Sequence, residues 1–527
     1  MNYNDLAARL DQIQETQRQQ SRSLRIQSLA IAFLVVLALL FVTREVSSQD
    51  FPTPSQALDW ALADQLQLSE SDRRWQRYLW IPPWLKTDEA AAVSSFGMNT
   101  AASQASIIIQ PRVIANGWML AVDLRRYAPR LEQLTHLVSV WDGLATTEPY
   151  FHVFQEFDSK VVAVLAPHVA QDHAVMLAEL NVSPALVYRL DWFLSRMLDQ
   201  SYYDFMGFGS EATFTSVLST VGVDEKLSRQ IGGDQRIALF RRDLNGKPGR
   251  IDRIQGAAGR FNTGAVWITR DLFDETVAID KHPIYNLLQF AEDGGEVIFE
   301  RQNGLHGFFL MNSQGKLVRE APPNLVNDHT VPAPHNRRLR PSISCLRCHG
   351  SDEGLKPVNN DVRTLLAAGA IDVVDDFGDV TKSREENIDR LAGLYAGDFT
   401  RRIQLGRDDY SLAVRVATQQ PTRPEGWTVP EISTLVSSIY GGYVYDAVGA
   451  ATACRELGYD PGDNPLATIR RVLPTLPPDP EIGITFEDPV AAALRVGIPV
   501  RRVDFERIYA TARLLTQERE RTNVENN

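Results

Sequence analysis

Cysteine is scarce in this sequence, and the scarcity limits what kind of protein the chain can be. Only three cysteines occur in 527 residues: Cys345, Cys348 and Cys454. Three cysteines cannot cross-link so long a chain, so a disulfide scaffold is excluded. Cys454 lies inside a helical pattern and is predicted to be a small buried apolar residue. The other two are three positions apart, which makes them the first candidates for a functional site.

The sequence also lacks an excess of basic residues. It has 54 lysines and arginines against 66 aspartates and glutamates, a formal net charge of −12, and its densest basic block is the short segment 337–340. A surface with this charge repels phosphate backbones, so nucleic acid is not expected as a partner. The length corresponds to two to four domains at about 150 residues each.

Only one stretch is apolar enough to cross a membrane. Residues 26–43 are uncharged and contain the unbroken apolar run 29–42. This length is near the short end of what spans a hydrocarbon core about 30 Å thick. We therefore expect a single transmembrane anchor at 25–44, preceded by a segment at 1–24.

Basic residues before this run predict its orientation. Arg18, Arg22 and Arg25 precede it, and the positive-inside rule then makes the segment 1–24 cytoplasmic. The bulk of the chain would be periplasmic, held at the cell inner membrane by one pass. A cleaved signal peptide is the alternative, because residues 46–48 are small residues at plausible cleavage positions.

The region after the anchor mixes helical and strand patterns. Helices are predicted at 56–68, 72–79 and 130–141, and a strand at 118–124. The span contains no phosphate-binding glycine loop and no nucleophile elbow. Neither a nucleotide-binding loop nor an esterase-type nucleophile is therefore expected in this part of the chain.

A hairpin pattern follows at residue 293. The apolar segments 296–300 and 305–311 flank Asn303-Gly304, and Asn-Gly is a strong hairpin signal because both turn positions favour positive φ. A second turn leads to a short strand at 317–318, which predicts a three-stranded antiparallel meander. Beyond Gly350 the pattern is largely helical, with helices expected at 383–394, 428–440, 446–457 and 504–515.

The paired cysteines belong to the motif Cys345-Leu-Arg-Cys348-His349, which is Cys-x-x-Cys-His, the attachment pattern of c-type haem. Two thiols one helical turn apart can both form thioethers with the haem vinyl groups, and the adjacent histidine then ligates iron. Cys345 and Cys348 are thus the predicted attachment residues for one covalent haem c, and His349 is the predicted iron ligand. Attachment takes place on the exported side of the bacterial membrane, in agreement with the predicted orientation.

Three other interpretations of the cysteine pair fit the sequence less well. A zinc site needs about four ligands, and no second Cys-x-x-Cys or close histidine pair completes one. A dithiol redox motif favours a strand-then-helix context, whereas this pair follows a proline-rich extended segment. A structural disulfide across so short a loop stabilises little.

The sequence after the motif lacks the residue types that usually supply a second iron ligand. After His349 the sequence contains no histidine and no methionine. Any second iron ligand must therefore come from upstream or from another chain, and a five-coordinate iron stays open. The nearest upstream candidates are His335, His329, Met311, His306 and His282.

These motifs resemble a family of large exported monohaem c-type cytochrome-domain proteins. The segment 293–349 carries the specific part of the resemblance: Asp293-Gly-Gly-Glu-Val-Ile-Phe299, Asn303-Gly-Leu305, Ala321-Pro322 and Ser344-Cys-x-x-Cys-His349. Weaker similarity is found at Val122–Tyr127, Glu148–Tyr150, Asp191–Phe193, Tyr202-Tyr203, Gly222–Asp224, Gly264–Asp271, Asp361–Arg363 and Leu391–Tyr395. The resemblance implies haem binding and electron transfer.

The family pattern also includes a His-Pro shortly before the Gly-Gly-Glu stretch, matched here by His282-Pro283. The resemblance therefore implies His282 as the second iron ligand. A second histidine of the pattern, upstream of the tryptophan motif, is absent here, where residues 251–256 stand.

Together these patterns predict an α+β protein with a small antiparallel sheet beside the haem site. The expected parts are a cytoplasmic segment at 1–24, an anchor at 25–44, a mixed α+β domain at 51–275, a haem c domain at 276–420 and a helical C-terminal region at 421–527.

The expected function is electron transfer by a membrane-anchored periplasmic monohaem c-type cytochrome, more an electron carrier than an enzyme. A five-coordinate haem enzyme or sensor for peroxide or a diatomic gas, and a haem-bearing interaction module of a membrane assembly, stay open. The redox partner is not identified, and an apolar stripe at Leu6, Leu10 and Ile13 leaves a homo-oligomer open.

Overall fold

The computed structural model divides the chain into two units between residues 51 and 52, and all the residues described here belong to the second, Pro52–Asn527. It describes residues 54–151, 186–223, 235–239, 249–255, 264–272, 291–321, 327–349, 354–356, 358, 386, 389, 393–395, 399–418, 432–473, 488–509 and 512. The predicted anchor at 25–44 and the segment at 1–24 lie outside these residues. Among the residues described, no helix is both long and apolar enough to traverse a bilayer.

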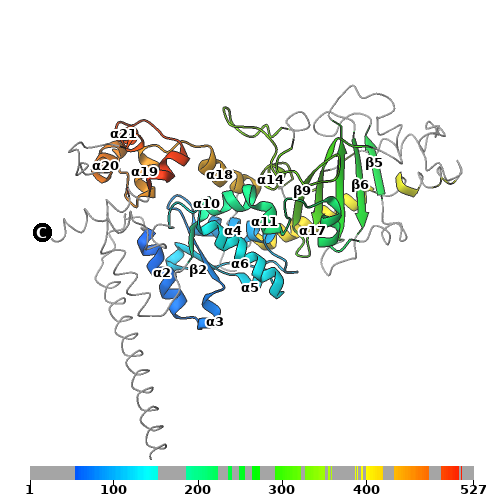
Figure 1. Cartoon of the computed structure of the whole chain (residues 1–527), viewed down its shortest axis with the longest axis horizontal. Helices are drawn as coiled ribbons and strands as arrows, with labels where there is room; N and C mark the ends of the chain where they lie inside the picture. The colour runs from blue at the N-terminus through cyan, green and yellow to red at the C-terminus, as the bar shows by residue number, and fades with distance from the viewer. Residues whose placement is uncertain are drawn as a thin grey trace, which may run out of the picture. The chain divides into compact units, whose positions relative to one another are not determined.

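The second unit combines helices with two sheets (Figure 1), which confirms the predicted α+β class. The strands are β1 (Gln76–Trp80), β2 (Arg112–Ile114), β3 (Met119–Asp123), β4 (Val187–Arg189), β5 (Gln235–Leu239), β6 (Gly249–Gln255), β7 (Ala265–Asp271), β8 (Gly294–Glu300) and β9 (His306–Asn312). The helices are α2 (Pro54–Leu66), α3 (Glu70–Arg73), α4 (Thr87–Ala101), η1 (Ala115–Gly117), α5 (Leu124–Tyr127), α6 (Leu131–Ala145), α10 (Leu190–Ser195), η2 (Arg196–Gln200), α11 (Tyr202–Met206), α12 (Phe214–Thr220), α14 (Ile343–His349), α17 (Phe399–Thr418), α18 (Ile432–Val444), α19 (Ala450–Glu456), α20 (Pro465–Val472) and α21 (Pro489–Arg495).

The first sheet has the strand order β2-β3-β1-β4. β1 is an interior strand, antiparallel to β3 and parallel to β4, and all of its side chains are buried. The predicted strand at 118–124 is confirmed as β3, but the predicted helix at 72–79 is wrong because β1 occupies much of that segment. Pairing on both sides of Tyr78–Trp80 overrides the local helical pattern, and aromatic side chains suit such a strand.

The second sheet is an antiparallel meander in the order β5-β6-β7-β8-β9. Its last hairpin confirms the predicted one: Glu300 pairs with His306, and Gly304 in the turn has a φ of +86°. The predicted third strand at 317–318 forms only an isolated bridge from Leu317 to Met311. The sheet instead extends upstream, so the expected boundary at residue 275 falls between the paired strands β7 and β8.

Two tyrosines of α11 cover the outer edge of β9. The phenolic oxygens of Tyr202 and Tyr203 accept hydrogen bonds from the backbone N–H groups of Phe308 and Leu310, each at 2.9 Å. An edge strand otherwise leaves such donors unpaired. The two phenols therefore satisfy buried donors of β9 and attach the sheet to the helices.

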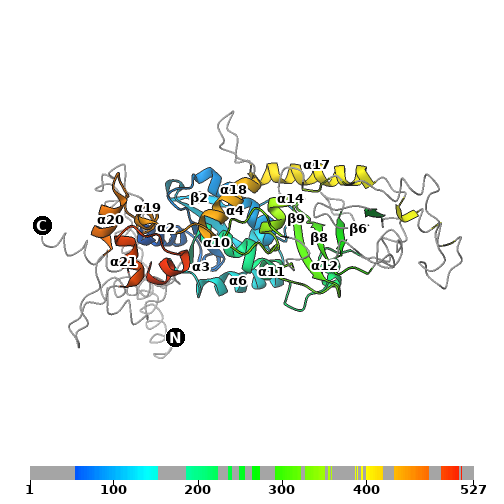
Figure 2. The ribbon, with the colours of Figure 1, turned by 90° about the horizontal axis from the view of Figure 1, so that it is seen from above.

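Helix α4 is buried on nearly all sides. Every residue from Ala90 to Ala101 is buried, and many are small. The helix contacts α10, α11, α17, α18 and β9, and Figure 2 shows it among these elements. Small residues allow this close approach: a Cβ on Gly97 would lie 2.7 Å from the Cε of Met197.

The described residues after 432 are largely helical, as predicted for the C-terminal region. A buried ion cluster attaches these helices to the first sheet. Arg189 of β4 donates hydrogen bonds to Asp191 at 2.7 Å and to Glu456 of α19 at 2.5 Å, and Arg502 also donates to Glu456. Both Arg189 and Glu456 are fully buried. Buried charges of this kind are stable only when paired.

Candidate functional site: the Cys-x-x-Cys-His helix and its surroundings

Helix α14 carries all three residues of the predicted attachment motif. Cys345 and Cys348 are one turn apart and His349 follows Cys345 by four positions, so the three side chains lie on one side of the helix. Cys345 is buried and Cys348 is exposed, and both are free thiols. The helix thus presents two thiols and an imidazole together, as the motif requires.

Hydrogen bonding fixes the orientation of His349. Its Nδ1 lies 2.9 Å from the carbonyl oxygen of Gly354, and because a carbonyl only accepts, Nδ1 carries the proton. The lone pair is then on Nε2, which is how a backbone carbonyl usually prepares a metal-ligating histidine. Burial lowers the pKa of His349 to about 4, the Gly354 bond opposes this, and Lys356 lowers it further. The imidazole is therefore neutral near pH 7.

Gly354 can only be glycine in this position. Its φ is +62°, a conformation that side chains disfavour. A Cβ on this residue would also lie 2.6 Å from the ring of Tyr410 and 2.8 Å from the Cε1 of His306. The missing side chain lets the backbone reach both rings while its carbonyl holds His349.

His306 is the second imidazole near this glycine. It begins β9, is 1% exposed and stacks on Tyr410 of α17 with ring centroids 4.3 Å apart and an interplanar angle of 21°. Neither of its ring nitrogens has a hydrogen-bond partner within the part of the chain that the structure describes. Burial, with a contribution from His349, lowers the pKa of His306 to about 3, so this imidazole is neutral too.

Asp328 anchors α14 from the preceding loop. Its carboxylate accepts hydrogen bonds from the Ser344 hydroxyl at 2.7 Å and from the Arg347 guanidinium at 2.9 Å, and from Thr330 as well. Burial raises the pKa of Asp328, but these hydrogen bonds outweigh it and leave the pKa below its ordinary value. The ionised, buried carboxylate of Asp328 is therefore hydrogen-bonded to Ser344 and Arg347, which lie on either side of Cys345 in the sequence.

Both cysteines of α14 are thiols at neutral pH. Burial, followed by the nearby charge of Glu296, raises the pKa of Cys345 well above its ordinary value. Burial also raises the pKa of Cys348, which Lys356 partly offsets. Reactive dithiols and zinc ligands depend on thiolates. Among the residues described, no group of three or more histidine, cysteine or acidic side chains is arranged to hold a metal ion.

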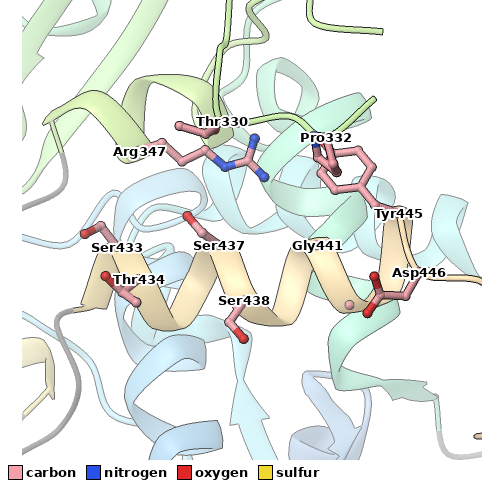
Figure 3. A pocket seen from close by; sticks show the side chains of 11 residues that line it. Thr330, Pro332, Arg347, Ser433, Thr434, Ser437, Ser438, Gly441, Tyr445 and Asp446 are labelled. Atoms are coloured by element: carbon pink, nitrogen blue, oxygen red, sulfur yellow. The ribbon is translucent and has the colours of Figure 1, made fainter. Parts of the chain in front are cut away.

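A pocket of about 460 Å³ opens on another side of α14 (Figure 3). Its walls are the loop around Thr330, the Arg347 side chain and the face of α18 that carries Ser437 and Gly441. Arg347 lies two residues from both Cys345 and His349, which places it on a different side of the helix. Its guanidinium lies 5.3 Å from the ring centroid of Tyr440. Arg347 therefore attaches α14 to α18 on the side away from the motif.

The other upstream ligand candidates have different surroundings from His306 or lie outside the described residues. Met311 is on β9 with His306 but five positions along, so the two side chains are on opposite faces of the strand. The ring of His335 contacts Tyr445 with centroids 4.8 Å apart, and His329 is exposed. His282, the residue that the family resemblance implies, lies outside the described residues.

The Gly-Gly-Glu and Asn-Gly-Leu motifs, which carry the family resemblance, contain residues that pack or form hydrogen bonds near this site. A Cβ on Gly295 would collide with the carbonyl oxygen of Thr269 in the neighbouring strand β7. The side chain of Asn303 accepts from the Leu305 N–H and donates to the carbonyl oxygen of Asn99 in α4, both at 3.1 Å. The Gly-Gly-Glu and Asn-Gly-Leu motifs thus position the β8–β9 hairpin that presents His306.

Sequence reasoning named His306 only as one of five candidates and did not identify Gly354, Tyr410 or Asp328. Gly354 and Tyr410 are 5 and 61 positions from His349, and only tertiary contacts bring them together. One signal was available for His306. It is the sole imidazole in the apolar strand His-Gly-Phe-Phe-Leu-Met, where a buried polar ring needs a partner.

Comparisons of the chain with protein families, with curated proteins and with solved structures give no match. The function is therefore inferred from the residues of this site and their geometry.

Proposed function

We propose that this protein is a membrane-anchored periplasmic monohaem c-type cytochrome that transfers electrons. One observation carries the proposal. Cys345, Cys348 and His349 lie on one side of α14, and His349 is held through Nδ1 by Gly354 at 2.9 Å, with Nε2 left to ligate a metal. Two free thiols and a pre-oriented imidazole at this spacing fit covalent haem attachment.

The site fits haem in its donor set as well as its spacing. Cys345 and Cys348 would form the two thioethers, and His349 would supply an iron ligand. Haem bound in this way supplies an iron that gains and loses one electron. The buried imidazole of His306, with two unpartnered ring nitrogens in the described part of the chain, further supports a metal-containing group nearby.

The chain's own residues hold this site rigidly. Asp328 grips Ser344 and Arg347 on either side of Cys345, and Gly354 fixes the ring of His349. The phenols of Tyr202 and Tyr203 attach the edge strand β9 to α11. Rigid ligand geometry favours electron transfer because little must rearrange when the charge changes.

The anchor and the location are proposed from the sequence. The apolar run at 29–42 and the preceding Arg18, Arg22 and Arg25 favour a single inner-membrane pass with a periplasmic bulk. Thioether formation on the exported side of the membrane requires the same orientation. The proposals of location and of haem attachment therefore support each other.

Haem staining after denaturing electrophoresis tests covalent attachment. Wild-type protein made together with haem-maturation machinery should stain, the Cys345→Ala/Cys348→Ala double variant should not, and each single variant should keep one thioether at most. Cys454→Ala is the matched control, because Cys454 is also buried but lies in α19, away from the motif. Absence of stain in the wild type would refute the proposal.

A further inference from the structure

Among the described residues, the buried imidazole of His306 has no hydrogen-bond partner. The ring is 1% exposed, and no described residue offers a hydrogen bond to Nδ1 or Nε2. A buried polar group without a partner costs about 1–3 kcal/mol. Coordination of a metal by the lone pair of a ring nitrogen would replace the missing hydrogen bond. Neutral histidine is the commonest metal ligand in proteins.

Two contacts hold this ring in place beside His349. Tyr410 stacks on one face of the His306 ring at 4.3 Å. Gly354 lies against its Cε1, and the carbonyl oxygen of the same glycine accepts the hydrogen bond from His349. One residue without a side chain thus positions both imidazoles.

The backbone of His306 is held in place by the β8–β9 hairpin. Glu300 and His306 are the last paired residues before the turn. Gly304 in that turn lies against Ala413 of α17, one helical turn from Tyr410, so that an added Cβ would be 3.0 Å from the Cβ of Ala413. The strand, the turn and α17 therefore carry the two stacked rings as one packed group.

We propose that His306 is the second axial ligand of the haem iron, in place of His282. This inference rests on the proposed haem attachment at Cys345 and Cys348. With His349 and His306 both ligating, the iron is six-coordinate and low-spin, and exogenous ligands cannot bind. Two imidazoles give a lower reduction potential than an imidazole and a thioether. Such a centre suits an electron carrier, because it leaves no iron position for the substrate of an enzyme or for the gas that a sensor binds.

Absorption and electron paramagnetic resonance spectra of purified holoprotein test the assignment. Wild type should be low-spin and should not bind carbon monoxide when reduced. His306→Ala should become high-spin and bind carbon monoxide, and added imidazole should restore the low-spin spectrum. His335→Ala is the matched control: it removes another imidazole that contacts a tyrosine, Tyr445, and should leave both spectra unchanged.

His306→Ala also leaves a cavity, which could change the spectra by itself. Methionine substitutions avoid this cavity. His306→Met keeps much of the side-chain volume and should convert the spectrum to that of a His/Met centre, with a thioether-to-iron charge-transfer band and a raised potential. His282→Met should keep the wild-type spectrum. A His/Met signature in His282→Met, or an unaltered low-spin spectrum in both His306 variants, would overturn the assignment, and so would a high-spin wild type.

Haem staining of the same samples separates the two proposals. Stain retained in His306→Ala with a changed spin state supports His306 as ligand and leaves attachment intact. Stain retained in the wild type with a spectrum that His306→Ala does not alter refutes only the ligand assignment. A wild type that binds no haem covalently refutes the proposed function itself.

Discussion

The Nδ1 of His349 donates a hydrogen bond to the carbonyl oxygen of Gly354 at 2.9 Å, and this contact joins α14 to the rest of the site. Gly354 in turn lies against His306 and Tyr410. A single backbone position therefore controls how the His349 imidazole is oriented and how closely α17 and β9 approach it.

Gly354→Ala should destabilise the protein more than a strained backbone alone explains. Its positive φ costs about 1–2 kcal/mol for any side chain, and the collision with Tyr410 and His306 adds about 1–3 kcal/mol. Denaturant unfolding measures the sum. Gly462→Ala is the control, since Gly462 also has a positive φ, +56°, but no atom within 4 Å of an added Cβ. Equal losses in the two variants would contradict the packing described for Gly354.

Tyr202→Phe should lower the free energy of unfolding by about 1–3 kcal/mol, because it leaves the buried N–H of Phe308 without an acceptor. Tyr127→Phe serves as the control. The hydroxyl of Tyr127 makes only a 3.4 Å bond to the carbonyl oxygen of Ile109, which Asn99 already satisfies at 2.7 Å. Chemical denaturation should therefore separate the two variants, and similar stabilities would show that the edge of β9 has another partner.

Glu456→Gln should destabilise the folded state by about 3–5 kcal/mol near pH 7, because Arg189 then keeps its buried charge with a weakened partner. Burial raises the pKa of Glu456, but Arg189 and Arg502 outweigh it, and the folded-state pKa is lowered.

The lowered pKa gives this effect a pH dependence. A carboxylate with a depressed folded pKa stabilises the fold above its unfolded pKa of about 4.3 and loses that contribution as the pH falls through the folded value. Unfolding measured from pH 7 downward should therefore show a decline below about pH 4.3 that is smaller in Glu456→Gln. Asp504→Asn, which removes a partly exposed partner of the exposed Arg501, should change the profile much less, because solvent screens this ion pair. A wild-type profile parallel to that of Glu456→Gln would contradict the paired state of Glu456.

A reporter fused after Asn527 should be active outside the cytoplasm, because the basic residues before the run at 29–42 favour a cytoplasmic N-terminus. N-terminal sequencing of the mature protein should find Met1 or Asn2. A sequence that starts near Gln49 would replace the anchor by a cleaved signal peptide, and a reporter active only in the cytoplasm would contradict the proposed orientation.

Features encoded by neighbouring residues could be predicted from the sequence. The β8–β9 hairpin follows from alternating apolar residues around Asn303-Gly304, because a turn that needs positive φ specifies its own register. The motif at 345–349 was equally clear, since its spacing alone brings two thiols and an imidazole to one side of a helix. The helical pattern of 446–457 also holds, with α19 ending just before Gly458.

Features that depend on distant residues could not be predicted. The segment 72–79 has a helical pattern, yet β1 forms there because β3 and β4 offer partners on both sides. The ion pair of Arg189 and Glu456 joins residues 267 positions apart. His306 could not be distinguished from the other upstream candidates, because Gly354 and Tyr410, which enclose its ring, lie far along the chain from it.

Mass spectrometry of the peptide that contains residues 341–349 tests the central claim most directly. Protein made with haem-maturation machinery should be digested and treated with a thiol-alkylating reagent. One haem should be found on this peptide, with Cys345 and Cys348 both protected from alkylation, while Cys454 is alkylated after unfolding. A peptide without haem, with both of its thiols alkylated, would contradict covalent haem attachment and with it the proposed electron-transfer function.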